Sequence, residues 1–131
     1  MFQAGPLSQL ALVGLGGFLG SVSRFFLSGL AHRIIPHLSF PLGTLVVNIL
    51  GCFLIGLLYG LADTRQLFGD EVRLFLIIGV LGGFTTFSTF GYETLALWRD
   101  AEVSWAVASV VLHLTAGLGA VWIGDAVGRL G

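Results

Sequence analysis

The sequence predicts an all-α membrane protein with four transmembrane helices, because its composition and its hydropathy pattern agree. Hydrophobic residues make up 56% of the 131 residues, charged residues only 10%, and the mean hydropathy is +0.97. A soluble domain usually carries about 25% charged residues, so this chain has too little charge to cover a surface that faces water. Four apolar stretches alternate with short charged connections.

Each apolar stretch is near the ~20 residues with which a helix spans the ~30 Å core of a bilayer. The connections leave no room for a soluble domain, so we expect a single transmembrane channel domain over residues 1–131. The expected helices cover residues 7–30, 41–62, 72–97 and 103–127.

The basic residues exclude several functions. All six are Arg, which excludes a Walker-type GKT or GKS loop and chemistry based on a Lys Schiff base. The net charge is -1 and no basic cluster is present, so we expect no nucleic-acid partner. No nucleotide motif is visible, and we do not expect an enzyme. We expect membrane lipid to surround the protein.

The distribution of Arg leaves the orientation in the membrane poorly specified. Four spans put both ends of the chain on one side, and the side with more Arg is normally cytoplasmic. Here the two sides are nearly balanced, so the chain could insert both ways and form an antiparallel homodimer. The alternative is that six charges are too few to decide. The terminal side has Arg65, Arg73 and Arg129, and the other side has Arg33 and Arg99, with Arg24 near it.

Glycines recur at four-residue spacing along the chain, and such GxxxG pairs let helices approach closely. Tight packing leaves little room for a pore within one subunit, so an oligomer is the expected host of any conduction. The pairs are Gly16 and Gly20, Gly56 and Gly60, Gly79 and Gly83, and Gly124 and Gly128.

The stretch GGFTTFSTF at 82–90 lies inside the third expected span. Gly82-Gly83 followed by Thr85-Thr86 is a poor helix former, so we expect the third helix to be broken near Gly82–Thr86. A break at membrane depth is tolerated where it is buried in protein or lines a cavity. Carbonyl groups freed there could coordinate a cation, because hard cations take oxygen ligands.

Three phenylalanines in this stretch, Phe84, Phe87 and Phe90, are three residues apart and are expected on one helix face. Such a stripe is ordinarily core packing. It could also turn electropositive ring edges towards an anion. Ser88 and Thr89 would add hydroxyl donors, and the resulting path would bind an anion weakly enough to release it.

The other spans contribute isolated polar residues. Asn48 is alone in TLVVNILGCFLIG, where an interhelical hydrogen bond is favoured over an amide donor to an anion. Arg24 could reach the membrane interface, or it could stand in an aqueous vestibule and attract anions.

In the fourth span, Trp105, Ser109 and His113 are four residues apart and share a face. They are either a polar track or an interfacial Trp with two hydrogen-bonded core residues, and taken alone the second interpretation is favoured. Glu93 in the third span could be an ion-coupling carboxylate or a group near the interface.

These elements together resemble the Fluc (CrcB) family of fluoride channels. The resemblance rests on GGFTTFSTF, on PLGTLVVNILGCFLIG at 41–56 and on GGFLGSVSR at 16–24, and it runs through all four spans. It implies a fluoride-selective channel of the inner membrane that passively exports fluoride and so lowers its cytoplasmic concentration. It also implies an antiparallel, dual-topology homodimer with two pores.

The resemblance assigns roles to residues of this chain. A structural sodium ion (Na+) at the dimer centre would be held by the backbone carbonyls of Gly82 and Thr85, and Arg24 would stand in a vestibule. The fluoride pore would consist of Asn48, Phe87, Phe90, Ser88, Thr89, Ser109 and His113.

This chain departs from the family pattern at three positions. Phe84 stands where Leu is common, Val80 where Phe is common, and His113 where a small hydroxyl or amide residue is usual. A His at that position could make conduction depend on pH, because an unperturbed His changes its charge near pH 6.5.

Two rival functions remain from the sequence. A small proton-coupled exporter also has four spans, and Glu93 would be its proton site. A structural subunit of a larger membrane complex would have a stable heteromeric partner and would conduct nothing alone. Neither rival explains the hydroxyls and rings of the broken third helix.

Overall fold

The computed structural model describes residues 5–131 and contains four helical segments that are long and apolar enough to cross a membrane. They agree with the four expected spans to within a few residues at each end, which confirms an all-helical, multi-pass membrane protein. The first two are α1 (Pro6–Ile34) and α2 (Leu42–Arg65), the third covers Asp70–Arg99, and the fourth is α6 (Val103–Leu130).

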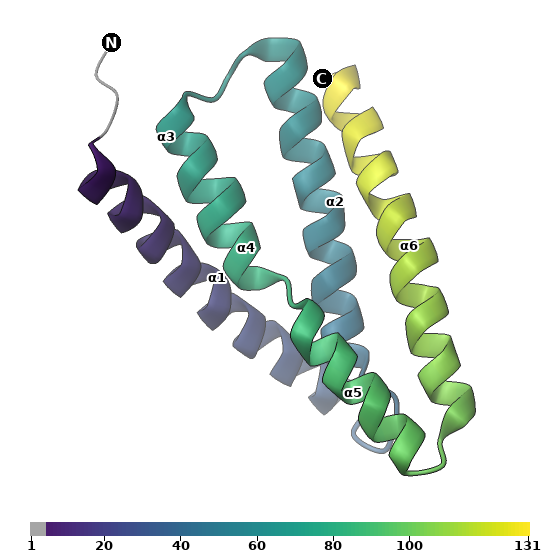
Figure 1. Cartoon of the computed structure of the whole chain (residues 1–131). Helices are drawn as coiled ribbons and strands as arrows, with labels where there is room; N and C mark the ends of the chain where they lie inside the picture. The colour runs from purple at the N-terminus through teal and green to yellow at the C-terminus, as the bar shows by residue number, and fades with distance from the viewer. Residues whose placement is uncertain (1–4) are drawn as a thin grey trace.

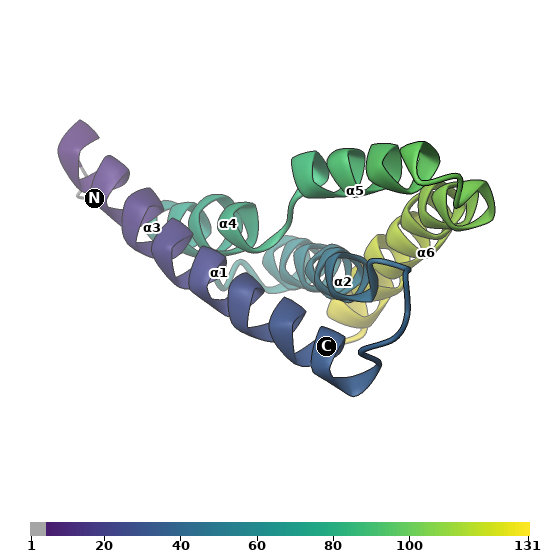
Figure 2. The same cartoon turned by 90° about the horizontal axis from the view of Figure 1, so that it is seen from below.

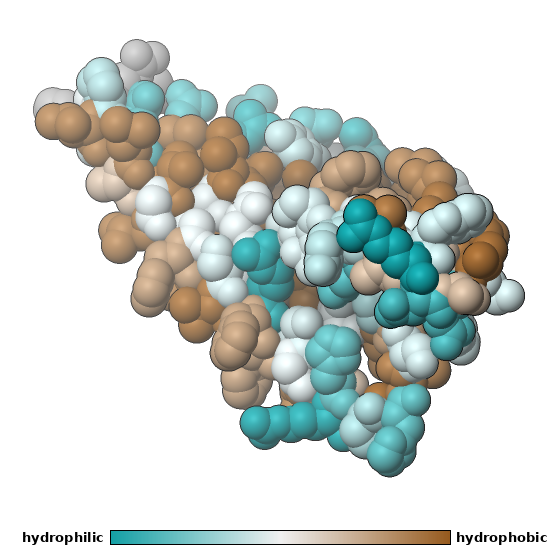
Figure 3. Space-filling model, turned by 60° about the horizontal axis from the view of Figure 1, so that its bottom comes forward, coloured by the Kyte–Doolittle hydropathy of each residue, from teal (hydrophilic) through white to brown (hydrophobic). Residues whose placement is uncertain are grey.

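The ends of the segments alternate between two ends of the molecule. α1 begins, α2 ends and α6 ends at one end, whereas the α1–α2 and α5–α6 connections lie at the other (Figure 1). Hydrophilic side chains gather where these two connections come forward, and apolar side chains cover the length of α1 (Figure 3). Large apolar residues face outwards on α1 and α6, for example Phe25 at 85% exposure and Trp122 at 74%. An apolar exterior of this kind requires lipid or another protein surface.

The third span is divided into four parts and is broken in the middle. These are α3 (Asp70–Arg73), the π-helix η1 (Leu74–Leu81), α4 (Gly82–Phe84) and α5 (Phe87–Arg99). Between α4 and α5 the chain is extended, with ψ 156° at Thr85 and φ -151° at Thr86. The expected break is confirmed. The π-helix was not expected, since the apolar run LFLIIGVL has the pattern of an ordinary membrane helix.

The break moves the third span from one neighbour to another. η1 and α4 pack along α1, whereas α5 packs against α6, and the two halves are visibly offset from each other (Figure 2). The first half therefore belongs to one helix pair and the second half to another.

Glycines form the two closest helix contacts. On the first seam, Gly16 of α1 faces Gly79 of η1, and Gly83 of α4 faces Gly17. A methyl group at Gly20 would overlap the carbonyl oxygen of Val80. The second seam joins α2 to α6 through the other two expected pairs. There, a methyl group at Gly124 would overlap the carbonyl oxygen of Phe53. The close approach expected from the GxxxG spacing is confirmed, and the helix partners are now identified.

Candidate functional site

Asn48 of α2 holds the broken backbone of the third span. Its Nδ2 donates to the carbonyl oxygen of Thr86 at 3.0 Å, and its Oδ1 accepts from the Thr86 N–H at 2.8 Å. In an unbroken helix that N–H would bond to the carbonyl of Gly82. The side chain thus pairs a backbone N–H that would be costly to leave unpaired in a membrane, and it adds a second donor to a carbonyl that also begins the hydrogen bonding of α5. The Asn48 amide NH₂ has two hydrogens, and the bond to the Thr86 carbonyl uses one of them.

Thr86 also begins α5 as its N-cap. Its hydroxyl oxygen accepts from the Thr89 N–H at 3.2 Å and donates to the Thr89 Oγ1 at 2.9 Å. The Ser88 Oγ lies 3.3 Å from the same oxygen. Because a hydroxyl has one hydrogen, Ser88 is the donor to Thr86 in this arrangement, and the Thr89 hydrogen remains available for another acceptor.

Two residues of α1 reach the carbonyl groups at the break. The Arg24 Nη1 donates to the Thr85 oxygen at 3.4 Å, and the Ser21 hydroxyl donates to the Gly83 oxygen at 3.5 Å. Gly82 is exposed, and its carbonyl has lost the Thr86 N–H to Asn48. The break therefore presents several carbonyl oxygens that no helical N–H occupies.

A first cavity of about 710 Å³ lies beside the break, between α1, α2 and α5. Arg24 and Arg33 give it positive character, His32 also lines it, and Thr89 lines it near the break. Glu93 also lines it, half-buried in the middle of α5, and its Oε1 accepts from the Thr44 hydroxyl at 2.8 Å. Its Oε2 is buried and has no hydrogen-bond partner in the part of the chain that the structure describes.

A second cavity of about 340 Å³ lies on the other side of Thr86, which lines both cavities. Asn48, Phe87 and His113 line this second cavity together. The two expected sodium ligands, Gly82 and Thr85, line it as well. The hydrogen-bonded pair of Asn48 and Thr86 therefore stands where the two cavities come closest to each other.

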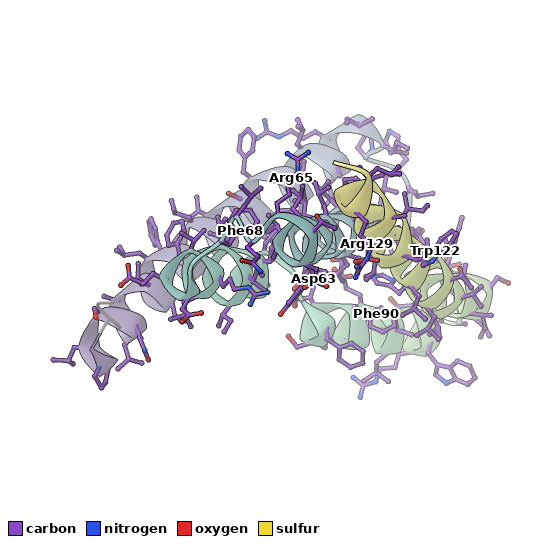
Figure 4. The ribbon with its side chains drawn as sticks, turned by 90° about the horizontal axis from the view of Figure 1, so that it is seen from above. Asp63, Arg65, Phe68, Phe90, Trp122 and Arg129 are labelled. Atoms are coloured by element: carbon purple, nitrogen blue, oxygen red, sulfur yellow. The ribbon has the colours of Figure 1, made fainter. Side chains whose placement is uncertain are left out.

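The phenylalanines do not form the single stripe that their spacing predicted. Phe84 is on α4 and is only 7% exposed, whereas Phe87 is on α5 and is 82% exposed. That expectation was wrong because the extended residues Thr85 and Thr86 interrupt the helical period. Phe87 and Phe90 do remain neighbours, with ring centroids 5.4 Å apart in an edge-to-face arrangement. Figure 4 shows Phe90 on α5, on the side of this helix nearest α6.

The stripe on α6 divides between packing and the cavity. Trp105 packs on Phe40, with ring centroids 5.3 Å apart, and Ser109 is fully buried. The Ser109 hydroxyl oxygen has no hydrogen-bond partner among residues 5–131. His113 stacks on Phe90 with centroids 4.2 Å apart, and its Nδ1 lies 2.9 Å from the Ser109 carbonyl oxygen.

The structure thus brings most of the predicted site residues to the two cavities. Ser88 is exposed and lines neither cavity, but its hydroxyl bonds to Thr86, which lines both. Ser109 bonds to His113 through its backbone carbonyl. Sequence reasoning missed Thr86 and Thr44. Thr86 could have been found, because a Thr directly before a new helical segment is a preferred N-cap. Nothing in the sequence paired Thr44 with Glu93, since they are far apart along the chain.

Comparison with known proteins identifies the family. Residues 11–125 match the family model described as CrcB-like protein, Camphor Resistance (CrcB). The chain is 47% identical over 116 residues to a protein of Methylobacillus flagellatus named fluoride-specific ion channel FluC, covering 88% of this chain and 91% of that protein. A FluC of Nitratidesulfovibrio vulgaris strain Miyazaki F is 40% identical over 126 residues, which cover 95% of this chain and 99% of the relative.

A third relative, named fluoride-specific ion channel FluC 1 of Methanosarcina acetivorans, is 42% identical over 115 residues, which cover 88% of this chain and 86% of the relative. The chain belongs to the CrcB family, to which these fluoride-specific channels also belong. The resemblance inferred from its motifs is confirmed. These three relatives are named as channels, not as enzymes.

Proposed function

We propose that this chain is a fluoride-selective channel of the inner membrane that exports fluoride passively. The observation that carries the proposal is the meeting of two cavities at Thr86, beside Asn48 and the Phe87–Phe90 pair. Kinship with proteins named fluoride-specific ion channels supplies the identity of the ion.

Fluoride is small and tightly hydrated, so a selective path must replace its water with hydrogen-bond donors. The second amide hydrogen of Asn48 and the free hydroxyl hydrogen of Thr89 are donors of this kind. The ring edges of Phe87 and Phe90 add weak positive potential without a fixed charge. Arg24 in the first cavity would concentrate anions at the entrance.

The direction of transport follows from the membrane potential. Neutral HF enters cells and dissociates inside, and a negative interior then drives fluoride out with about 2.3 kcal/mol per charge per 100 mV. A passive channel therefore lowers cytoplasmic fluoride without an energy-coupling domain.

The working unit is an antiparallel homodimer. Phe87 is 82% exposed in a single chain, so a pore that uses it needs a second surface to enclose it. The large apolar residues that face outwards and the nearly balanced Arg distribution are consistent with two oppositely inserted copies.

A sodium ion at the centre of the dimer fits the donors present at the break. Gly82 is an exposed residue whose carbonyl lacks its helical donor, and the Thr85 carbonyl, which has two lone pairs, accepts one long bond from Arg24. Two oxygens are too few for a hard cation, but two copies would bring four. Sodium would fix the two breaks against each other.

Fluoride efflux from liposomes that contain the purified chain or its Asn48→Asp variant tests this function. We expect rapid efflux from the wild type and none from the variant, since a carboxylate would repel the anion. Equal efflux from both would contradict the proposed path. Efflux that depends on a proton gradient and disappears in Glu93→Gln would instead indicate the proton-coupled exporter, which the unpartnered Glu93 Oε2 favours.

A further inference from the structure

The ring of His113 is held by two contacts that determine which nitrogen carries hydrogen. Its Nδ1 lies 2.9 Å from the carbonyl oxygen of Ser109, one turn earlier on α6, and its face stacks on Phe90. A carbonyl oxygen can only accept a hydrogen bond, so Nδ1 must be the donor. The neutral ring therefore has its single N–H at Nδ1.

The other nitrogen consequently changes its character with protonation. In the neutral ring Nε2 presents a lone pair, which repels an anion, and in the imidazolium it presents a charged N–H, which attracts one. The structure leaves Nε2 buried and without a hydrogen-bond partner among the described residues. A buried polar atom in this state needs a partner that arrives from elsewhere.

The surroundings of His113 hold no acid that could supply the counter-charge. In the described lining of the second cavity, the one other titratable side chain is Cys52 of α2, and η1, α4 and the break contribute none. α5 also packs against α6, and the residues that it places near His113 are Phe87 and Phe90. Its acidic residue, Glu93, is bonded to Thr44 in the first cavity. Arg24, His32 and Arg33 likewise line the first cavity.

We propose that His113 is an anion-contacting residue that takes up a proton when an anion occupies the second cavity and releases it when the cavity empties. This inference rests on the proposed fluoride conduction, because fluoride is the anion concerned. Proton and anion then bind together, and each strengthens the binding of the other by the same factor. Fluoride conduction is therefore faster at low pH than at high pH.

The first experiment measures fluoride efflux from liposomes at about pH 5.5 and about pH 8, on either side of the ordinary His titration. Efflux from protein-free liposomes is subtracted, because neutral HF crosses the bilayer itself at low pH. We expect several-fold faster efflux at the lower pH for the wild type, and a flat profile for His113→Ser and for His113→Gln. His37→Gln is the matched control, since His37 is exposed in the α1–α2 connection, and it should keep the wild-type profile.

Three outcomes would overturn the inference. They are a flat wild-type profile, a pH dependence that persists in His113→Ser, and a pH dependence that disappears in Glu93→Gln instead. In each of these the proposed channel function survives, because fluoride still passes. Absence of fluoride efflux at every pH would reject the channel function itself.

A second measurement does not depend on flux. Nitrogen NMR of the purified protein with labelled histidine resolves the three His rings, and His113→Ser identifies the signal of His113. We expect the fraction of His113 with a protonated Nε2, at a fixed pH, to increase when sodium fluoride is added. Sodium chloride at the same concentration is the control. A fraction that fluoride does not change would overturn the inference, whatever the efflux shows.

Discussion

The two halves of the third span pack against different helices and differ in chemistry. Before the break, η1 and α4 are apolar and lie against α1 through Gly79 and Gly83, with backbone in contact with backbone. After it, α5 carries hydroxyls and exposed rings, and a methyl group at Gly91 would meet nothing within 4 Å among the described residues. The comparison teaches that one half anchors the break and the other half presents the groups that an ion would meet.

Asn48 has a structural role as well as a proposed role in conduction, because it bonds to Thr86 between the two halves. Asn48→Leu should have the largest effect on the folded protein. It leaves the Thr86 N–H without its partner, at about 1–3 kcal/mol, and removes one of the two hydrogen bonds to the Thr86 carbonyl, which as the N-cap carbonyl also accepts the first bond of α5. We expect a large loss of folded protein in detergent, measured by size-exclusion chromatography and thermal unfolding.

Asn48→Asp is the matched control for the structural role, since it keeps the acceptor for the Thr86 N–H and loses the donor to the carbonyl. It should fold better than Asn48→Leu and still fail to conduct fluoride. Equal stability of the two variants would show that the amide does not hold the break.

The glycine contact of the first half should be next in size. In Gly83→Ala the new methyl group would lie 2.5 Å from the Gly17 carbonyl oxygen, and overpacking of this kind costs about 1–3 kcal/mol. Gly91→Ala adds the same methyl group to the second half, in open space, and replaces a poor helix former. We expect a lower unfolding temperature for Gly83→Ala only. A matching decrease for Gly91→Ala would remove the distinction between the halves.

Phe87 should show the reverse behaviour. Because the ring is 82% exposed in the single chain, Phe87→Ile should leave the stability of that chain nearly unchanged. Fluoride efflux should decrease by about tenfold or more, which corresponds to about 1.4 kcal/mol in the barrier. Normal efflux from Phe87→Ile and Phe90→Ile would remove the proposed role of the rings.

The smallest effect is expected at the end of the molecule away from the break. Arg129 of α6 bonds to Asp125 at 2.8 Å and to Asp63 of α2 at 3.1 Å. Figure 4 shows Asp63 and Arg129 close together at this end of the molecule. Exposed ion pairs contribute little. Arg129→Ala should therefore change neither efflux nor unfolding temperature measurably, and a clear loss of stability would show that this contact holds α2 to α6.

The sequence was sufficient for features that depend on local pattern. Hydropathy predicted the four spans, GxxxG spacing predicted the close helix contacts, and Gly82 with Thr85 and Thr86 predicted the break. It was insufficient where tertiary contacts decide. The bond between Thr44 and Glu93, and the position of Phe84 away from Phe87, follow from how α4 and α5 are offset. The π-helix of η1 follows neither from propensity nor from periodicity.

The most direct measurement compares fluoride and chloride efflux, side by side, from liposomes that contain the purified wild-type chain. The donors at the break replace the water of a small anion, so we predict rapid efflux of fluoride and no detectable efflux of chloride. Chloride efflux as fast as that of fluoride, or none of either ion from a correctly folded protein, would contradict the claim that the broken third span forms a fluoride-selective path.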